Sequence, residues 1–315
     1  MRKIVISGAT GQDGAYLIEA LRQRGDVTIT ALVRRCARDL NPDLGVDVLE
    51  GDIRDSGITQ RIAALKPDEI YNLAALSHVG HSFDCPDDVI QTNTLGCLHM
   101  LEAAKQSGAR FYQASTSEIF GNSPSPQSEI TPLAPASPYA IAKVAAYHLV
   151  RLYREAYGVF ACNGILFNHE SPRRGADFVT QKVCMAVARI ARGEQDKLRL
   201  GNLSARRDWG HAADYARGMV MMLRCDHPGD YVLATGISRT VAELCEAAFG
   251  VVGISDWQRY VETDDDLKRP LDVQHLRGDA SKARITLGWE PTTTFNDMIE
   301  EMVRAQFGNQ YVDRR

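Results

Sequence analysis

KIVISGATGQDG, at residues 3–14, is the stretch of sequence that decides the fold. Its first five residues form a short apolar run typical of a buried strand, and apolar residues at helical spacing follow the last glycine. Three glycines spaced GxxGxxG allow a tight turn from strand to helix, where backbone N–H groups approach a pyrophosphate at the positive end of the helix. The alternative is a plain turn. We expect a dinucleotide site that contains Gly8, Gly11, Gln12, Asp13 and Gly14.

Strand-like and helix-like segments alternate along the chain after this turn. Strand-like runs lie at residues 27–33, 46–49, 68–73, 110–114 and 160–166, and helical patterns lie at 89–106 and 139–157. Such alternation is typical of a parallel sheet with helices on both faces. We therefore predict an α/β fold: a doubly wound parallel sheet of the Rossmann type with a smaller C-terminal substrate lobe.

The pattern changes after residue 166, where shorter elements with many arginines begin. We expect residues 1–166 to form the cofactor domain and residues 167–315 to form the lobe, with part of 205–240 packing back on the first domain. A Pro/Ser-rich segment at residues 123–138 precedes the second helical pattern. We expect this loop to flank the active site.

Composition excludes several classes of partner. The chain has 315 residues, 44% of them hydrophobic, a net charge of −4 and seven cysteines without a CxxC pair. No basic stripe favours nucleic acid or a membrane surface, so we expect a small-molecule substrate. The cysteine pattern argues against a disulfide framework and a thiolate metal site, so we expect reduced, mostly buried thiols and no metal. Without a signal peptide or an apolar run of about 18 residues, we expect a cytoplasmic protein.

The end of the second expected strand bears on which dinucleotide binds. An NAD site usually places an acidic residue there for the ribose 2′-hydroxyl, but this sequence has Arg34 and Arg35. Guanidinium groups suit a 2′-phosphate, so the pair favours NADP, although two adjacent arginines could equally form an exposed loop. Asp52 follows the third expected strand, where it could meet the adenine amino group or simply form a turn.

Four residues in the middle of the chain indicate acid–base chemistry on an alcohol. Tyr139 and Lys143 are four residues apart and share a helix face, so the ammonium could favour the phenolate and make Tyr139 a base near neutral pH. Thr116 offers a hydroxyl to hold the substrate oxygen. Glu118 adds a second base that simple alcohol oxidation does not require, which suggests elimination beside hydride transfer; the alternative is a solvated turn carboxylate.

Several blocks of the sequence resemble one family over nearly the whole chain. These blocks are GATGQDGAYL at residues 8–17, YQASTSEIFG at 112–121, SPYAIAK at 137–143, NGILFNHESPRRG at 163–175 and LGNLSARRDWG at 200–210. The first and third blocks are general to the short-chain dehydrogenases, whereas the last two contain residues that are more specific to dehydratases acting on GDP-linked sugars. The chain resembles the GDP-mannose 4,6-dehydratases, which are extended short-chain dehydrogenases.

This resemblance implies roles for individual residues. The implied catalytic residues are Thr116, Ser117, Glu118, Tyr139 and Lys143. Beside the glycine turn, the implied NADP ligands are Arg34, Arg35, Asp52, Ile53, Leu73, Ala74, Ala75, Ser77, Tyr139, Lys143, His169 and Arg174. The implied sugar-nucleotide ligands are Ser77, Asn168, Glu170, Val179, Lys182, Leu200, Asn202, Arg207, Arg269 and Asp272. The charges of two of these residues fit a sugar nucleotide, because Arg207 and Arg269 supply the bidentate donors that a diphosphate needs. His169 could also be a core histidine, and Arg207 part of a surface pair.

The sequence also departs from the family pattern. The segment after Arg35 is short where the family carries a longer loop that reaches a neighbouring subunit, so we expect a homodimer, with a tetramer possible. Leu76 replaces a common polar residue and Ala136 an arginine. Asp272 replaces a glutamate, and the shorter side chain moves its oxygens by about 1.5 Å. The sugar or the base could therefore differ.

We predict a sugar-nucleotide 4,6-dehydratase that converts GDP-mannose to GDP-4-keto-6-deoxymannose by internal hydride transfer through bound NADP. The partner is therefore a GDP-linked hexose or heptose. The alternatives are dehydration of GDP-mannoheptose, a 4-ketosugar reductase or epimerase, and a non-catalytic NADP-sensing protein.

Overall fold

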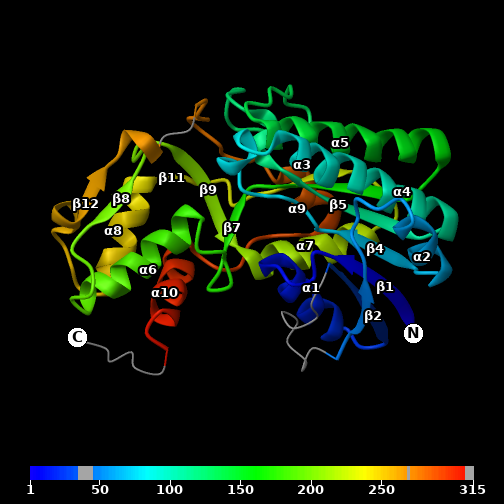
Figure 1. Cartoon of the computed structure of the whole chain (residues 1–315), viewed down its shortest axis with the longest axis horizontal. Coiled ribbons are helices and arrows are strands. Elements are labelled where there is room, and N and C mark those ends of the chain that lie inside the picture. The colour runs from blue at the N-terminus through cyan, green and yellow to red at the C-terminus, as the bar shows by residue number, and fades with distance from the viewer. Residues whose placement is uncertain (35–44, 268–269, 309–315) are drawn as a thin grey trace.

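The computed structural model describes residues 1–34, 45–267 and 270–308 (Figure 1). Its main sheet has seven strands, all parallel, in the order β10-β6-β5-β4-β1-β2-β3. The strands are β1 (Arg2–Ser7), β2 (Val27–Val33), β3 (Asp47–Glu50), β4 (Glu69–Asn72), β5 (Arg110–Thr116), β6 (Ala161–Leu166) and β10 (Asp230–Leu233). Chain order reverses between β1 and β4, as in a doubly wound sheet. The predicted α/β fold class is confirmed.

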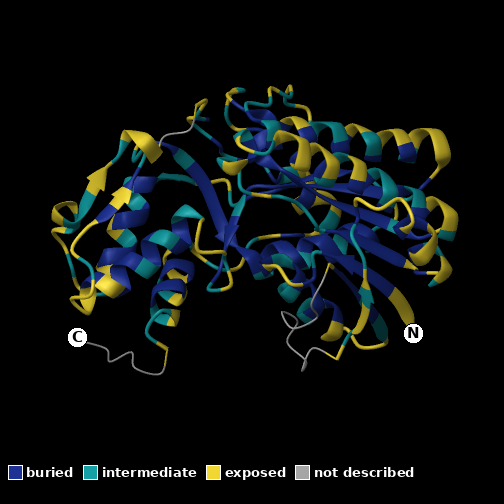
Figure 2. Cartoon of the chain, viewed as in Figure 1, coloured by how far each residue is buried: buried dark blue, intermediate teal, exposed yellow. Residues whose placement is uncertain are grey.

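Helices cover both faces of this sheet. One face packs on α1 (Gln12–Arg22), α7 (Ala212–Arg224) and α9 (Ser281–Leu287), and the other on α2 (Ile58–Ala64), α4 (Gly96–Ser107) and α5 (Pro138–Tyr157). Successive side chains of β1 alternate between the two cores: Ile4 and Ile6 join the first, and Val5 joins the second. The inner strands β4 and β6 are buried along their whole length, whereas the edge strand β3 is mostly exposed (Figure 2).

The helix predicted at residues 89–106 has a different form. The chain instead makes α3 (Pro86–Ile90), one wide π-helical turn over Gln91–Leu95, and then α4. Inside the wide turn, the buried side chain of Asn93 accepts a hydrogen bond from Leu76 N at 2.9 Å and donates one to Leu76 O at 3.1 Å. The turn therefore holds the segment that leaves β4.

The C-terminal half contributes to both parts of the molecule. Its own elements are a three-stranded sheet of β7 (Asn168–Glu170), β9 (Arg206–His211) and β11 (Ser238–Thr240), and a pair of β8 (Leu198–Leu200) and β12 (Val261–Thr263). Helices α6 (Val179–Ala191), α8 (Val241–Val251) and α10 (Phe295–Ala305) pack together in the lobe core. Short 3-10 turns lie at His81–Phe83, Ser117–Phe120, Trp257–Tyr260 and Asp265–Leu267. From the segment 205–240, β10 pairs with β6 and α7 packs against α1. The boundary at residue 166 stays a prediction.

No helix within the described ranges is long and apolar enough to cross a membrane. Six cysteines lie in those ranges and all are free thiols, of which four are buried and two, Cys85 and Cys225, are partly exposed.

The glycine turn is constrained by close packing. Gly8 directly follows β1 and has φ +72°, and a Cβ there would lie 2.8 Å from Ala74 N and 2.9 Å from Leu73 C at the exit of β4. At Gly14, in the first turn of α1, a Cβ would lie 2.5 Å from both Ala9 Cα and Gly8 O. The turn can pack this closely against β4 and α1 because glycine has no side chain at either position.

We predict that Gly8→Ala destabilises the protein by about 2 kcal/mol or more. The left-handed backbone costs a non-glycine residue about 1–2 kcal/mol, and overlap with a packed backbone adds about 1–3 kcal/mol. Gly108→Ala is the matched control, because Gly108 has φ +73° but an added Cβ meets nothing within 4 Å. Urea unfolding measures both variants. Equal losses of unfolding free energy would show that the approach to Ala74 contributes nothing.

Candidate active site

One cavity of about 1220 Å³ lies at the carboxyl ends of the parallel strands and extends to the lobe. This is the edge at which ligands bind in open α/β sheets. Its walls come from the glycine turn, the exits of β2, β3, β4 and β5, helix α5, strand β7, helix α6 and the segment after β8. The cavity therefore brings together segments that lie far apart in the sequence.

Nearly all the residues expected to act at this site line the cavity. They are Gly8, Gly11, Gln12, Asp13, Arg34, Asp52, Ile53, Leu73, Ala74, Ala75, Ser77, Thr116, Ser117, Glu118, Tyr139, Lys143, Asn168, His169, Glu170, Arg174, Val179, Lys182, Leu200, Asn202, Arg207 and Asp272. Gly14 does not line it, because its role is to let α1 pack on the turn. Arg35 and Arg269 lie outside the described residues.

The Pro/Ser-rich loop was expected to flank the active site, and it does so without lining the cavity: Ala134 N donates to Ile119 O at 3.0 Å, next to Glu118, and Ser137 caps the helix that carries Tyr139. None of the described residues 121–138 is among those that line the cavity. The loop also packs against residues 274–279: the buried side chain of Gln127 donates to His275 O at 3.2 Å, and Arg277 N donates to Gln127 Oε1 at 3.0 Å. The hydrogen-bond partners of the buried Gln127 side chain thus lie in residues 274–279 and not in the cavity.

The acid–base residues meet where β5 ends and α5 begins. Thr116 is the last residue of β5, and its Oγ1 accepts a hydrogen bond from Glu118 N at 3.2 Å. The hydroxyl of Thr116 also hydrogen-bonds with the phenol of Tyr139. Ser137 caps α5 by accepting from Ala140 N at 3.1 Å, which places Tyr139 in the first helical turn. Thr116, Glu118 and Tyr139 are each no more than 8% exposed.

Lys143 does not act on Tyr139 as expected. Its Nζ donates to Ala114 O at 2.8 Å and lies 5.8 Å from the centroid of the Tyr139 ring. Burial raises the pKa of Tyr139 to about 12, and the Thr116 hydrogen bond offsets this only in part. Burial also lowers the pKa of Lys143 to about 8. In the chain alone the phenol is therefore a weaker acid than free tyrosine, against the expectation of a base near neutral pH.

A chain of buried hydrogen bonds connects the glycine turn to Lys143. Ser7 Oγ donates to Asn72 Oδ1 at 2.6 Å, and Asn72 Nδ2 donates to Gln113 Oε1 at 2.7 Å. Gln113 Nε2 then donates to Ala114 O at 2.9 Å, the oxygen that also accepts from Lys143. Asn72 and Gln113 were not predicted from the sequence. Polar residues near the ends of two adjacent apolar strands were the available signal.

An ion pair joins the glycine turn to strand β7. His169 Nε2 lies 3.0 Å from Asp13 Oδ2, and His169 Nδ1 lies 2.7 Å from Phe167 O. Both partners are acceptors, so both ring nitrogens donate and the ring is an imidazolium. The ring stacks on Tyr215 at a centroid distance of 4.7 Å. Gln12 Nε2 donates to His169 O at 3.0 Å, so two neighbouring residues of the turn hold this segment.

The pKa shifts of Asp13 and His169 agree with an ion pair. Burial opposes ionisation of both groups, but their mutual attraction and hydrogen bond outweigh it. The pKa of Asp13 falls to about 2, and the pKa of His169 is raised above its usual value. His169 is thus not a neutral core histidine.

Glu170 and Arg174 form a second charged pair in the same wall. Glu170 is 2% exposed, and its Oε2 accepts from Thr180 Oγ1 at 2.6 Å and lies 3.0 Å from Arg174 Nε. The guanidinium of Arg174 lies 3.5 Å from the centroid of the Phe178 ring. Aromatic stacking and the carboxylate hold the guanidinium at the cavity.

The far ends of the cavity carry further polar groups. At the sheet end, Asp52 is paired with Arg54 at 2.8 Å, which lowers the pKa of the Asp52 carboxyl. At the lobe end, Asp272 Oδ1 lies 3.6 Å from Arg207 Nη2, and Asp272 Oδ2 accepts from Asn202 Nδ2 at 3.0 Å. Three of the expected sugar-nucleotide residues therefore contact one another.

The cavity also contains residues that were not predicted from the sequence. Among them are the aromatic or basic residues His78, His81, Phe178, Arg189, Lys197 and Arg199. The rings of His78 and His81 stack at a centroid distance of 3.8 Å. Their position directly after the fourth strand was the available signal, because residues at strand exits share one edge of the sheet. Among the described residues, no group of three or more His, Cys, Asp or Glu side chains could hold a metal ion.

The residues at the glycine turn fit a dinucleotide. A side chain at Gly8 would overlap the exit of β4, so the turn keeps backbone at the cavity surface beside the N-terminus of α1. Backbone N–H groups at a helix N-terminus suit a pyrophosphate.

We predict that Asp13→Asn lowers the pKa of His169, because the neutral amide no longer stabilises the imidazolium. NMR titration of the His169 ring measures this. Asp84→Asn, an exposed substitution outside the cavity, is the control and should leave the His169 titration unchanged. An unaltered His169 titration in Asp13→Asn would contradict the ion pair.

The same variant should show a defined pH dependence of stability. The Asp13 contribution is complete above its unfolded value of 3.8 and is lost as pH falls through about 2. The His169 contribution is complete below its unfolded value of 6.5 and is lost as pH rises through the raised folded pKa. The loss of unfolding free energy in Asp13→Asn, roughly 2 kcal/mol, should therefore be greatest between about pH 4 and 6.5.

A known protein family and its individual members match this chain over almost its full length. The sequence model of the family described as GDP-mannose 4,6 dehydratase matches residues 5–302. GDP-mannose 4,6 dehydratase 2 of Arabidopsis thaliana is 47% identical to the chain, with 96% of this chain and 86% of that protein covered. GDP-mannose 4,6-dehydratase of Sinorhizobium fredii is 46% identical, with 96% of each covered.

Solved structures of related enzymes share the fold. A dTDP-glucose 4,6-dehydratase from Streptomyces venezuelae with NAD and TYD bound is 25% identical, with a TM-score of 0.85 over 98% of this chain and 97% of that chain. UDP-glucose 4-epimerase of Thermus thermophilus in complex with NAD is 26% identical, with a TM-score of 0.85 over 98% and 99%. With the family match over residues 5–302 and relatives above 40% identity, the chain belongs to the GDP-mannose 4,6-dehydratase family.

Proposed function

We propose that the chain is a sugar-nucleotide 4,6-dehydratase that converts GDP-mannose to GDP-4-keto-6-deoxymannose. The family match and the names of the relatives support this assignment. The observation that carries it is the position of Glu118: a carboxylate 8% exposed, in the same cavity as Tyr139 and one hydrogen-bonded turn from Thr116. Oxidation of an alcohol needs one base, and this site has a second.

A nicotinamide dinucleotide bound in the cavity would accept hydride from C4 of the sugar and return it to C6 after dehydration. Tyr139 takes the proton of the 4-hydroxyl, and Thr116 holds the 4-oxygen. The raised pKa of Tyr139 makes its phenolate a strong base, and Arg174 is a nearby cation that favours the phenolate. Lys143 fixes the end of β5 through Ala114 O.

Glu118 acts between the two hydride transfers. A ketone at C4 makes the C5 proton acidic, and Glu118 removes it while the C6 hydroxyl leaves as water. When hydride is returned to C6, Glu118 gives a proton back to C5, so the net change is the loss of one water. Ser117, beside Glu118 in the cavity wall, assists proton delivery to the leaving oxygen. The lobe end of the cavity, with Arg207, Asn202 and Lys182, supplies the donors that a nucleoside diphosphate requires.

We also propose that the dinucleotide is NADP and that the enzyme works in the cytoplasm. Arg34, an exposed residue that lines the cavity at the end of β2, supports NADP because a guanidinium suits a 2′-phosphate. Free thiols at every described cysteine are consistent with a reducing compartment.

Arg34→Ala should weaken NADP binding by about tenfold or more, because a charge-assisted contact contributes about 1.5–3 kcal/mol, and should leave NAD binding nearly unchanged. Titration of both dinucleotides by fluorescence measures this. Arg284→Ala, on α9 and outside the cavity, is the control. NAD binding as tight as NADP binding in the unmodified protein would refute the NADP assignment.

We propose a homodimer formed through α4 and α5. Leu95, Ile141 and Leu152 lie on or beside these helices with 45–51% of their surface exposed. Ile141, His148 and Leu152 recur at helical spacing, so α5 presents an exposed stripe, and a two-fold pairing would bury it.

Leu152→Glu should therefore shift the protein from dimer to monomer in sedimentation velocity. Ile285→Glu is the matched control, because Ile285 is 83% exposed on α9 and lies away from the stripe. A monomeric unmodified protein at micromolar concentration would exclude the dimer.

The dehydratase proposal is tested at Glu118. Glu118→Gln keeps the shape of the side chain but removes the base, so turnover should fall by about 10² to 10⁴. Oxidation at C4 should survive and give bound NADPH absorbance on addition of GDP-mannose, without deuterium entry at C5 from D₂O. Tyr139→Phe should abolish both signals, and Glu300→Gln, a partly exposed carboxylate on α10 that pairs with Arg304, should change neither. Dehydration by Glu118→Gln near the unmodified rate would remove Glu118 from the mechanism.

A further inference from the structure

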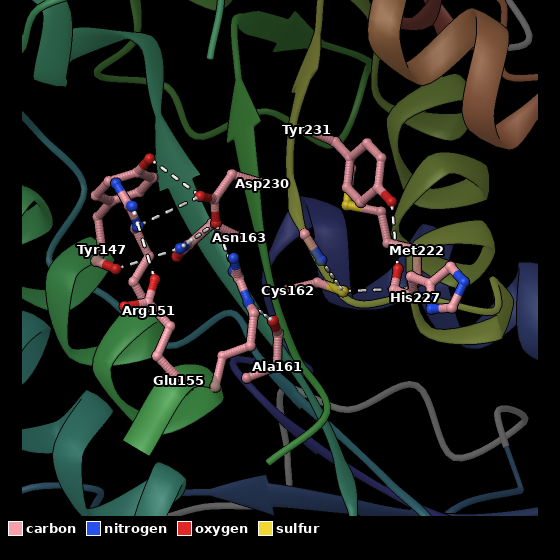
Figure 3. Close-up of polar contacts among 12 residues, drawn as sticks. Tyr147, Arg151, Glu155, Ala161, Cys162, Asn163, Met222, His227, Asp230 and Tyr231 are labelled. Atoms are coloured by element: carbon pink, nitrogen blue, oxygen red, sulfur yellow. Dashed lines mark hydrogen bonds and ion pairs between the residues drawn. The ribbon is translucent and has the colours of Figure 1, made fainter. Parts of the chain in front are cut away.

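Two cysteine thiols lie together at the opposite end of the sheet from the active-site cavity. Cys162 is the second residue of β6 and is fully buried, whereas Cys225 directly follows α7 and is partly exposed. Cys162 Sγ donates to Met222 O at 3.4 Å (Figure 3). Cys225 Sγ donates to the same carbonyl oxygen at 3.1 Å. The shared acceptor places the two sulfurs beside each other.

The surroundings distinguish the two sulfurs. Cys162 Sγ accepts from Gly229 N at 3.4 Å, and Cys225 Sγ donates to His227 O at 3.0 Å. Cys225 is thus the thiol that solvent reaches, and Cys162 is buried behind it. Neither residue lines the active-site cavity.

A rigid network holds the backbone beside Cys162. Asp230 Oδ1 accepts from Arg154 Nη2 at 2.6 Å and from Asn163 Nδ2 at 2.9 Å, and Asp230 Oδ2 accepts from Tyr147 OH at 3.1 Å (Figure 3). These bonds fix β6, β10 and α5 to one another. Cys225 lies in the connection between α7 and β10, outside this network.

We propose that Cys162 and Cys225 are a redox-active dithiol that a two-electron oxidant such as hydrogen peroxide closes into a disulfide. The Cys225 thiolate attacks the peroxide O–O bond, which breaks to give a sulfenic acid and, with one proton, water. Cys162 then attacks the Cys225 sulfur: the S–S bond forms, the S–O bond breaks, and hydroxide leaves with the Cys162 proton as a second water. Two thiols are oxidised, and one peroxide is reduced to two waters.

The other described cysteines lack this arrangement. Cys184 and Cys245 interact in the lobe core, but both are buried, so peroxide reaches neither. Cys85 is partly exposed and its sulfur donates to His81 O at 3.2 Å, without a second thiol among its contacts. Within the described residues, only Cys162 and Cys225 combine a partly exposed thiol with a buried one that shares its hydrogen-bond acceptor.

The test uses the full chain, reduced and then treated with hydrogen peroxide or diamide in stoichiometric amounts. After alkylation and digestion without reductant, mass spectrometry should find one peptide pair joined between Cys162 and Cys225, and reductant should release it. Peroxide treatment should consume two thiols per chain. A different dominant pairing, or Cys225 remaining alkylated while the protein is otherwise oxidised, would overturn the proposal.

Three variants make the assignment specific. Cys162→Ala should stop at the Cys225 sulfenic acid, which dimedone traps, and Cys225→Ser should leave Cys162 reduced because peroxide does not reach it. Cys85→Ser is the matched control with a partly exposed thiol elsewhere, and should form the same disulfide as the unmodified protein. The disulfide is identified in the unmodified protein alone, so a poorly folded Cys162 variant would leave that result intact. The test does not depend on the proposed activity.

Discussion

A chain of buried hydrogen bonds across β1, β4 and β5 is the interaction on which the arrangement of the site depends. Ser7, Asn72 and Gln113 are each no more than 1% exposed, and their side chains link end to end before Ala114 O joins the chain to Lys143. An unpaired polar group buried here would cost about 1–3 kcal/mol. A slip of one residue in any of the three strands would break the chain and turn these side chains to the other face. The strand ends that hold the cavity are therefore in fixed register.

The same interaction explains the unexpected electrostatics of Tyr139 and Lys143. Because Lys143 is held by Ala114 O, its charge anchors α5 to the end of β5 instead of approaching the phenol. The phenol is hydrogen-bonded with Thr116 and buried, so its pKa rises to about 12. The burial that fixes the position of Tyr139 also makes its phenol a weaker acid. The positive charge that favours the phenolate must therefore come from elsewhere in the cavity, and Arg174 contributes it.

Features encoded by local pattern could be predicted from the sequence. The apolar run and the glycine spacing at residues 3–14 specify a strand, a turn and a helix, and the packing at Gly8 and Gly14 gives the physical reason. Tyr139 and Lys143 do share a helix and a cavity, as their spacing indicated. Interactions between distant segments could not be predicted. The wide turn at Gln91–Leu95 is held by Asn93 and Leu76, and the partner of Gln127 lies about 150 residues further along the chain. Side-chain partners of this kind follow from tertiary packing, which residue type and spacing do not reveal.

The two walls of the cavity are tied together by the path of the chain. After β6 the chain leaves the main sheet to form β7, and after β9 it returns through α7 to add β10 beside β6. Each crossing is fixed by buried polar contacts: Asp13 and Gln12 hold the segment around His169, and Asp208 accepts from Thr235 and Gly236 after β10. The lobe is therefore attached to the sheet at both the outgoing and the returning strand. That double attachment holds residues from β7, β9 and α6 opposite Thr116 and Tyr139 across one cavity.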